Sequence, residues 1–470
     1  MKDGGEAGLS TVEEIVPLPR LAGVTPPEGQ LSFWKFFRMA RHNGLAVIPR
    51  SAYEQPVIEQ NILGFRTYLI NDPAGVREVL LDHVAEYPKT SLEKRALGLA
   101  VGRGLLTSDG EVWRAHRRIM APSFDHRSIQ GYAPVMVEAT DRQADRWDAE
   151  PGGQVIDIAD AMMHVTLDII ARTMFSAETA HMAGLVERTI RGFQAMADFG
   201  VPDLLPVIGP LRWRMHERRS RAIFADFDRE IRRLIEGRAA DPTSGGPDLL
   251  GRLIAARDEE TGGGMGAEEL RDQVVTIFLA GHETTALAMT WTWYLLSQHP
   301  AALAKLENEL DAVVGDRAPR HEDLPKLPYA RMVVEEAMRL YPPAPGLSAR
   351  LATKERVIAG TRVPKGAAVA VMPWVLHRHR LLWDEPDRFD PERFSPERSV
   401  GRHRFAYLPF GGGPRICIGL AFAMVEAVLI LATLARRYRF HLMPDQVIDP
   451  HQAITLRPRY GMKMRLERRI

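Results

Sequence analysis

The chain has 470 residues but only one cysteine, Cys417. A single cysteine excludes an intrachain disulfide, and it excludes zinc and iron–sulfur sites that need several thiolate ligands. An excess of either charge is also absent, because 61 lysines and arginines stand against 60 aspartates and glutamates. A balanced chain gives no electrostatic reason for binding nucleic acid. We therefore expect no nucleic-acid partner and no multi-cysteine metal centre.

Long hydrophobic runs are absent as well. Residues 1–29 lack the apolar core of a signal peptide. The longest apolar candidate, residues 419–434, is interrupted by Glu426 and falls short of the roughly 20 residues that a membrane-spanning helix needs. These absences predict a cytoplasmic protein without a transmembrane anchor. No sequence feature demands an oligomer, so we expect a monomer.

The residues that are present predict a largely helical chain. Apolar residues recur with helical spacing through most of residues 110–340. Alternating apolar residues predict a strand pair over residues 57–72, with its turn at residues 61–64, followed by a short helix that Asp72 and Pro73 open. Shorter strands are expected over residues 356–373 and 454–466. We therefore expect a mainly α fold with a minor β portion (α+β).

The domain organisation follows from the same pattern. No internal repeat or abrupt change of composition divides the chain, so we expect one large helical domain over residues 1–470. Residues 1–30 are rich in proline and glycine and predict an irregular N-terminal arm. The alternative is two helical lobes divided near residues 240–266, where glycines and prolines interrupt the helical pattern.

Cys417 lies in an unusual stretch, FGGGPRICIG, at residues 410–419. A lone cysteine is usually a small buried hydrophobic residue. Here, however, an apolar helical run follows it, and a helix N-terminus together with Arg415 favours the thiolate. A cysteine with a lowered pKa is either a nucleophile, which needs a positioned base, or a metal ligand. No histidine is marked as that base, so we favour a thiolate ligand of haem iron, with Arg415 paired to a haem propionate.

The same ten residues carry a family resemblance. Every fixed position of the haem-binding signature of the cytochrome P450 superfamily is filled, namely by Phe410, Gly411, Gly413, Arg415, Cys417 and Gly419. The resemblance implies one haem b, whose iron is bound by the Cys417 sulfur, with Phe410 and Gly411 beside it. It also implies a fold in which the haem lies between this cysteine loop and a long central helix.

That central helix is expected over residues 267–298, a run about 48 Å long. Gly281, Glu283 and Thr284 are unusual in the middle of an apolar helix, because glycine weakens it and a charge is costly there. The sequence from Ala280 to Thr285 is similar to the oxygen-activation motif of the superfamily. The resemblance implies that Gly281 lies at the cofactor, that Thr284 donates a hydrogen bond to bound oxygen, and that Glu283 relays protons from solvent.

Three further residues are predicted to form a buried ionic triad behind the haem. Glu336 and Arg339 lie three residues apart on one helix face, and Arg393 follows in the segment PERF. Their order resembles the corresponding segments of the superfamily. A buried triad is costly unless every charge is paired. We therefore expect that loss of Arg339 abolishes haem incorporation.

The resemblance also implies basic and aromatic partners for the haem propionates. Trp113 and Arg117 lie four apart on one helix face and are similar to the family helix that touches the propionates. Arg350 also fits a propionate partner.

The implied reaction splits dioxygen, inserts one oxygen atom into a substrate and releases the other as water. No Gly-x-Gly-x-x-Gly unit for a flavin or nicotinamide is present, so the electrons must come from outside. We expect a ferredoxin or flavodoxin with a reductase that uses NAD(P)H. An acidic carrier of this kind would be attracted by the basic residues around the cysteine loop if they face the surface. These are Arg402, Arg404, Arg415, Arg436 and Arg437.

The resemblance places the substrate against residues 91–106, 192–209 and 344–348, and against Phe278, Ala280, Leu347 and Ile454. These positions are mainly apolar, so we expect an apolar small molecule such as a fatty acyl, terpenoid, steroid or aromatic compound. Three alternatives remain open at this point. They are a peroxide-driven haem-thiolate peroxygenase, a haem-binding sensor or electron carrier without substrate turnover, and a helical scaffold with an inert cysteine.

Overall fold

The structure is a computed structural model that describes residues 21–29, 31–62, 65–150, 152–176, 185, 188–189, 208–241 and 248–469. Most of the predicted N-terminal arm and most of the predicted substrate segment 192–209 lie outside these residues. Residues 21–29 contain no helix or strand. Their chain is nevertheless held, because Ala22 N donates to the Tyr294 hydroxyl and the Tyr341 hydroxyl donates to Ala22 O.

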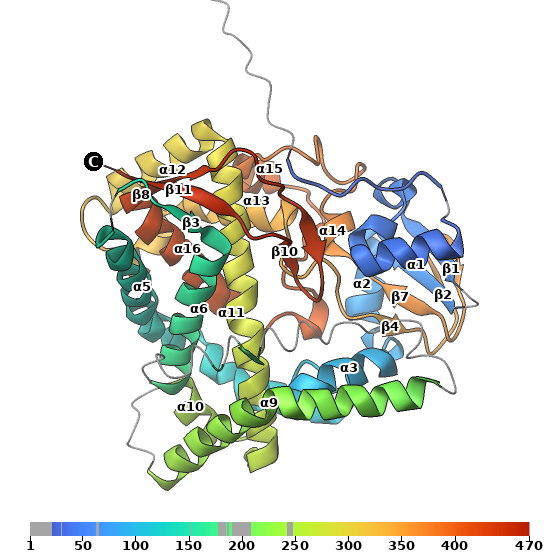
Figure 1. Ribbon diagram of the computed structural model, residues 1–470. Helices are drawn as coiled ribbons and strands as arrows, with labels where there is room; N and C mark the ends of the chain where they lie inside the picture. Colours follow the sequence, from blue (N-terminus) through green and yellow to red (C-terminus); the bar gives the residue numbers. More distant parts are fainter. Residues whose placement is uncertain are drawn as a thin grey trace, which may run out of the picture.

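Four long helices pack against one another in the helical part of the molecule (Figure 1). They are α5 (His126–Asp148), α6 (Ile158–Phe175), α11 (Ala267–Gln298) and α16 (Leu420–Arg437). Aspartate side chains cap two of them, since Asp125 accepts from Ser128 N at the start of α5 and Asp157 accepts from Ala159 N at the start of α6. Helix α11 packs against α6 and α16, so its apolar sides are covered. The prediction of a helix over residues 267–298 is confirmed.

The remaining α-helices pack around these four. They are α1 (Phe33–His42), α2 (Pro73–Arg77), α3 (Ser91–Val101), α4 (Gly110–Met120), α9 (Ile208–Ala240), α10 (Leu249–Ala255), α12 (Pro300–Val313), α13 (Pro328–Leu340), α14 (Pro373–Leu376) and α15 (Pro396–Ser399). None of the helices in the described part of the chain is long and apolar enough to cross a bilayer. Asp72 accepts from Gly75 N and caps α2, as predicted.

A four-stranded sheet lies at one side of the helices, with order β1-β2-β7-β4 (Figure 1). Strands β1 (Val57–Ile62) and β2 (Phe65–Ile70) are antiparallel, so the predicted strand pair is confirmed, and β1 extends to Ile62, one residue into the range predicted for the turn. Strand β7 (Ala368–Ala370) runs parallel to β2, and β4 (Arg350–Leu351) closes the other edge. This sheet brings Arg350 to the interior of the molecule.

Smaller sheets complete the fold. Strands β3 (Val155–Asp157), β11 (Lys463–Arg468) and β8 (Tyr438–Leu442) form one sheet, and β5 (Arg356–Ile358) pairs with β6 (Thr361–Val363). A final hairpin joins β9 (Pro450–Gln452) to β10 (Leu456–Pro458). The strands predicted over residues 356–373 and 454–466 are therefore confirmed, as is the mainly α fold with a minor β portion.

Candidate active site

A cavity of about 790 Å³ lies between α11 and the cysteine loop, residues 410–419. Its walls are mostly apolar, and three of the four predicted substrate residues, Ala280, Leu347 and Ile454, line it. An apolar enclosure with a few polar groups is typical of a site for a small molecule or cofactor.

Phe278 does not line the cavity, which corrects the prediction. Its side chain is fully buried among the rings of Phe175 and Phe227, with centroid separations of 6.0 and 5.5 Å. Two residues along a helix turn the side chain by about 200°, so Phe278 and Ala280 face opposite ways. Ile277, on the same face as Ala280, lines the cavity instead.

The cysteine loop presents Cys417 to the cavity. The backbone N–H of Cys417 donates to Phe410 O over 2.9 Å, and helix α16 begins three residues later, at Leu420. Gly413 has a φ of +66°, and a Cβ added there would lie 1.9 Å from Leu80 O. Only glycine satisfies both conditions.

The expected direction of the Cys417 pKa is wrong. Although the sulfur is open to the cavity, the surrounding protein desolvates the thiol and raises its pKa. A hydrogen bond from Gly419 N and the charge of Arg117 act in the opposite direction but do not prevail.

Cys417 is not part of a cluster of metal-ligating side chains among the described residues. Within the described ranges, no group of three or more histidine, cysteine, aspartate or glutamate side chains is placed to hold a metal ion. A metal at this sulfur would therefore need its other ligands from a cofactor, which a porphyrin supplies. The apolar cavity wall facing the sulfur fits such a planar group.

One end of the cavity gathers positive charge. Helix α4 contributes Arg117 and Trp113, β4 contributes Arg350, and the cysteine loop contributes Arg415. The Arg415 guanidinium lies 4.2 Å from the centre of the Trp113 ring, and Arg117 donates to Ile416 O over 2.6 Å. The Nε atom of buried Arg350 has no partner among the described residues. A buried donor of this kind fits an anionic group such as a propionate.

Lys89 is a fifth residue at this end, and sequence reasoning missed it. Burial, together with the charges of Arg415 and Arg350, lowers the pKa of Lys89 to about 8. Two acidic residues, Glu93 and Asp109, act on this group, and Asp109 pairs with Arg415 and with Lys94. The Arg415 guanidinium also donates to Ser108 O over 2.8 Å, so much of its hydrogen bonding is to protein.

The predicted oxygen motif lies on the cavity wall at the middle of α11. Gly281, Glu283 and Thr284 all line the cavity. The Thr284 hydroxyl donates to Ala280 O over 2.8 Å. The helix stays α-helical through this stretch, so the small side chains of Ala280 and Gly281, rather than a break, make room for a ligand.

Glu283 is held by two residues from the β9–β10 hairpin, which sequence reasoning also missed. Its Oε1 atom accepts a hydrogen bond from the Thr455 hydroxyl over 2.6 Å and forms an ion pair with Arg457.

Glu426 on α16 is a second acidic residue beside α11, and its side chain is fully buried. Burial raises the pKa of Glu426 to about 8, and a hydrogen bond from Thr285 opposes that rise.

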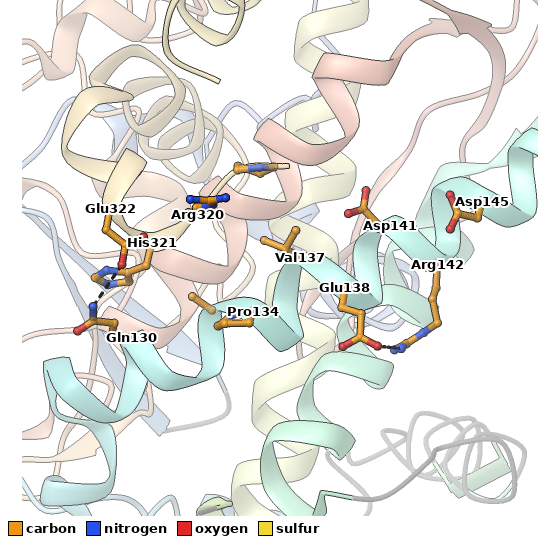
Figure 2. A pocket seen from close by; sticks show the side chains of 12 residues that line it. Gln130, Pro134, Val137, Glu138, Asp141, Arg142, Asp145, Arg320, His321 and Glu322 are labelled. Carbon is orange, nitrogen blue, oxygen red and sulfur yellow. Dashed lines mark hydrogen bonds and ion pairs between the residues drawn. The ribbon is translucent and has the colours of Figure 1, made fainter. Parts of the chain in front are cut away.

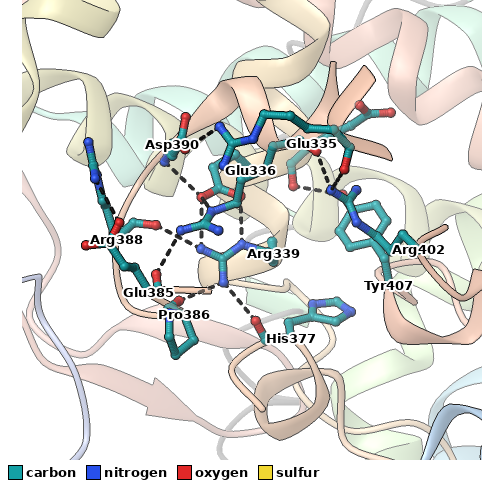
Figure 3. A network of polar contacts seen from close by, with 12 residues as sticks. Glu335, Glu336, Arg339, His377, Glu385, Pro386, Arg388, Asp390, Arg402 and Tyr407 are labelled. Atoms are coloured by element: carbon teal, nitrogen blue, oxygen red, sulfur yellow. Dashed lines mark hydrogen bonds and ion pairs between the residues drawn. The ribbon is translucent and has the colours of Figure 1, made fainter. Parts of the chain in front are cut away.

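The predicted ionic residues Glu336, Arg339 and Arg393 lie together. Figure 3 shows Glu336 and Arg339 at the middle of this network. The Arg339 guanidinium pairs with both Glu336 oxygens, at 2.7 and 2.8 Å, and Arg393 Nε lies 3.3 Å from Glu336 Oε1. Arg339 also donates to the carbonyl oxygens of His377 and Pro386. All of these charges are paired, as a buried network requires.

A second pocket, of about 500 Å³, lies between α5 and residues 319–322 (Figure 2). It shares no lining residue with the cavity at Cys417. Several of its polar side chains have protein partners: Glu138 pairs with Arg142, Gln130 donates to Glu322, and Asp141 and Asp145 pair with Arg437 outside the pocket. The arrangement gives no set of free ligands for a cofactor.

Comparison with known proteins agrees with this geometry. The model of the family described as Cytochrome P450 matches residues 26–464. Cyclooctatin synthase of Streptomyces melanosporofaciens is 38% identical over 83% of this chain and 84% of its own length. Pentalenene oxygenase of Streptomyces avermitilis is 35% identical over 78% of this chain and 80% of its own length.

A solved structure extends the likeness to the fold. The crystal structure of the cytochrome P450DA heme domain aligns with a TM-score of 0.79 and 28% identity, over 95% of this chain and 96% of that chain. The sulfur-lined cavity, the threonine and glutamate on α11 and the buried triad therefore occur in a chain of known family. The chain belongs to the cytochrome P450 family and is a cytochrome P450 monooxygenase.

Proposed function

We propose that this monooxygenase inserts one atom of dioxygen into a terpenoid, by hydroxylation or epoxidation. The observation that carries the proposal is the arrangement of Cys417 and Thr284 in one apolar cavity of about 790 Å³. Three relatives support the substrate class, namely cyclooctatin synthase, cyclooctat-9-en-7-ol 5-monooxygenase and pentalenene oxygenase. A rigid, apolar substrate matches a cavity with few polar groups, since each buried polar group must find a partner.

The cofactor of the proposal is haem b. Cys417 would hold it from one face, with Phe410 and Gly411 beside it. Arg117, Arg350, Arg415 and Lys89 would bind its propionates, with Trp113 packed on Arg415. When bound, haem supplies the redox chemistry that splits dioxygen and oxidises the substrate.

The chain's own side chains relay protons from solvent. The Thr284 hydroxyl lies on the cavity wall and would donate its proton to the reacting oxygen when it turns from Ala280 O. The Glu283 carboxylate, one residue earlier, would restore that proton from solvent. This pair favours dioxygen over the peroxide-driven alternative, because hydrogen peroxide already carries the protons that the pair would supply.

Electrons would come from a ferredoxin or flavodoxin, reduced by an NAD(P)H-dependent reductase. The arginines first expected to attract this partner are not equally available. Arg415 faces inward to Asp109, and Arg437 is paired with Asp141 and Asp145. Arg402 lies over the Trp383 and Phe394 rings. Arg404 is exposed and is left as the candidate for contact with an acidic carrier, because Arg436 donates to Asp316 O from the far end of α16.

Substrate trials test the proposal directly. The haem-loaded enzyme would be incubated with spinach ferredoxin, its reductase, NADPH and, separately, pentalenene, lauric acid, testosterone or naphthalene. We expect oxygenated pentalenene as the main product, with its new oxygen derived from labelled dioxygen. Faster oxidation of lauric acid, or faster turnover with hydrogen peroxide than with the reductase system, would contradict the proposal. The predicted cytoplasmic location and monomeric state stay predictions.

A further inference from the structure

The β9–β10 hairpin reaches the cavity with side chains of two kinds. Ile454, in its turn, lines the cavity and is 43% exposed there. The next residue, Thr455, donates its hydroxyl proton to Glu283 Oε1 over 2.6 Å, and Arg457 forms an ion pair with the same oxygen. One short segment thus touches both the space for substrate and the carboxylate on α11.

Strand geometry explains why Thr455 and Arg457 act together. Alternate residues of a strand point to the same face, so these two reach Glu283 while Leu456 points into the core. Leu456 is fully buried and fixed through both of its backbone polar groups. Its N–H donates to Pro343 O over 2.9 Å, and its carbonyl oxygen accepts from Trp291 Nε1 over 3.0 Å. The strand is therefore a fixed platform for its two neighbours.

The bonds leave Glu283 anchored by one oxygen only. Both described contacts end on Oε1, and no hydrogen bond joins Oε2 to the described residues. The Glu283 side chain is 13% exposed and the Arg457 side chain is 23% exposed, so the ion pair is largely shielded from solvent. The buried Nε of Arg457 has no partner among the described residues, as is common where an ordered water binds.

We propose that Arg457 and Thr455 are positioning residues for Glu283. They fix the carboxylate at the cavity wall, with Oε2 left to exchange protons. The inference rests on the proposed function, because it assumes that Glu283 supplies protons to Thr284. A free glutamate side chain occupies several rotamers, and loss of placement by about 1 Å can cost two orders of magnitude in rate.

The test compares Arg457→Met with Arg457→Lys, Thr455→Val and Glu283→Gln in the haem-loaded enzyme. Arg459→Met is the matched control, because Arg459 lies two residues further along and pairs with Asp449 at 2.9 Å, away from Glu283. Pentalenene is the substrate used. Two turnover routes are measured for every variant, one driven by the reductase system and one driven by hydrogen peroxide.

We expect Arg457→Met to lower kcat of the reductase-driven route by roughly tenfold, less than the roughly 10²–10⁴-fold that a general acid or base contributes, because Glu283 itself remains. KM should change little, and the enzyme should release hydrogen peroxide instead of oxygenated pentalenene. Peroxide-driven turnover should be spared, because that oxidant carries its own protons. Arg457→Lys should recover part of the loss, Thr455→Val should show a smaller loss, and Arg459→Met should match the wild type.

A second measurement does not depend on turnover. The free energy of unfolding is measured for Arg457→Met, Glu283→Gln and the double variant. Non-additive changes would show that the two side chains interact, whereas additive changes would overturn the proposal. Loss of both turnover routes in Arg457→Met would also overturn it, as would an unchanged Arg457→Met beside an impaired Glu283→Gln. An unchanged Arg457→Met beside an impaired Glu283→Gln would leave the proposed function intact. An unimpaired Glu283→Gln would show instead that Glu283 does not supply protons to Thr284.

Discussion

Gly413 shows how closely the cysteine loop is fitted to its neighbours. Its φ is +66°, and an added Cβ would lie 1.9 Å from the backbone oxygen of Leu80, which has no room to move. The loop that carries Cys417 therefore depends on a residue without a side chain.

Gly413→Ala should accordingly destabilise the loop and lower the haem content. The strain of a left-handed alanine costs about 1–3 kcal/mol, and the collision with Leu80 adds to it. Haem per protein and the midpoint of thermal unfolding are the measurements. Gly360→Ala is the control, because Gly360 has a φ of +79° but open space around its Cβ position. Equal effects at both positions would contradict the packing argument.

Glu426 is a second residue whose surroundings decide its chemistry. Burial raises its pKa from an ordinary value of 4.5 to about 8. The folded state then binds its proton more tightly than the unfolded state does. The stability that this carboxyl contributes is complete at low pH and is lost as the pH rises from about 4.5 through 8.

Glu426→Gln should remove that dependence, because an amide does not titrate. Its melting temperature should approach that of the wild type near pH 5 and exceed it by a few degrees above about pH 8. Thermal unfolding of both proteins across this range is the measurement. Melting curves that shift in parallel with pH would show that Glu426 does not titrate as described.

At the scale of elements, the segment behind α13 is organised by one guanidinium. Arg339 pairs with Glu336, and its side chain is fully buried. It also binds three backbone carbonyls of residues 377–388. One side chain thus joins a helix to an irregular segment that has no strand or helix to fix it.

Arg339→Ala should therefore prevent the segment from forming and abolish haem incorporation. Removal of one partner from a buried ion pair costs about 3–5 kcal/mol, because the other charge stays buried. Haem absorbance per protein after expression with excess haem precursor is the measurement. Arg331→Ala is the control on the same helix, since Arg331 is 63% exposed in its pair with Glu335. A normal haem content in Arg339→Ala would contradict the account.

Elements were also what the sequence predicted best. The limits of α11 follow from Gly266 before it and Pro300 after it, and the motif residues follow from local spacing. The partners of Glu283 were not predictable, because Thr455 lies 172 residues away along the chain. The prediction for Phe278 was wrong, because the sequence alone did not show which face of α11 points to the cavity and which packs against neighbouring helices. Lys89 had no motif around it, so only the fold placed it at the cavity.

At the scale of the whole molecule, distant parts of the chain meet around one cavity. Residues from Leu80 to Thr455 line it, and they come from helices, a sheet edge and loops. The sequence predicted the chemistry of this site from residue types. It did not predict the shape of the cavity, because loop conformations far apart in sequence determine that shape. The substrate class therefore rests on relatives as well as on the cavity walls.

The bond between the Cys417 sulfur and haem iron is the central claim, and one spectrum tests it. The purified enzyme is reduced, saturated with carbon monoxide and compared with the Cys417→Ala variant. We expect the wild type to show the absorption band displaced to the red that a thiolate ligand produces, and the variant to lack it. A wild type without the band, or a variant that retains it, would contradict the account.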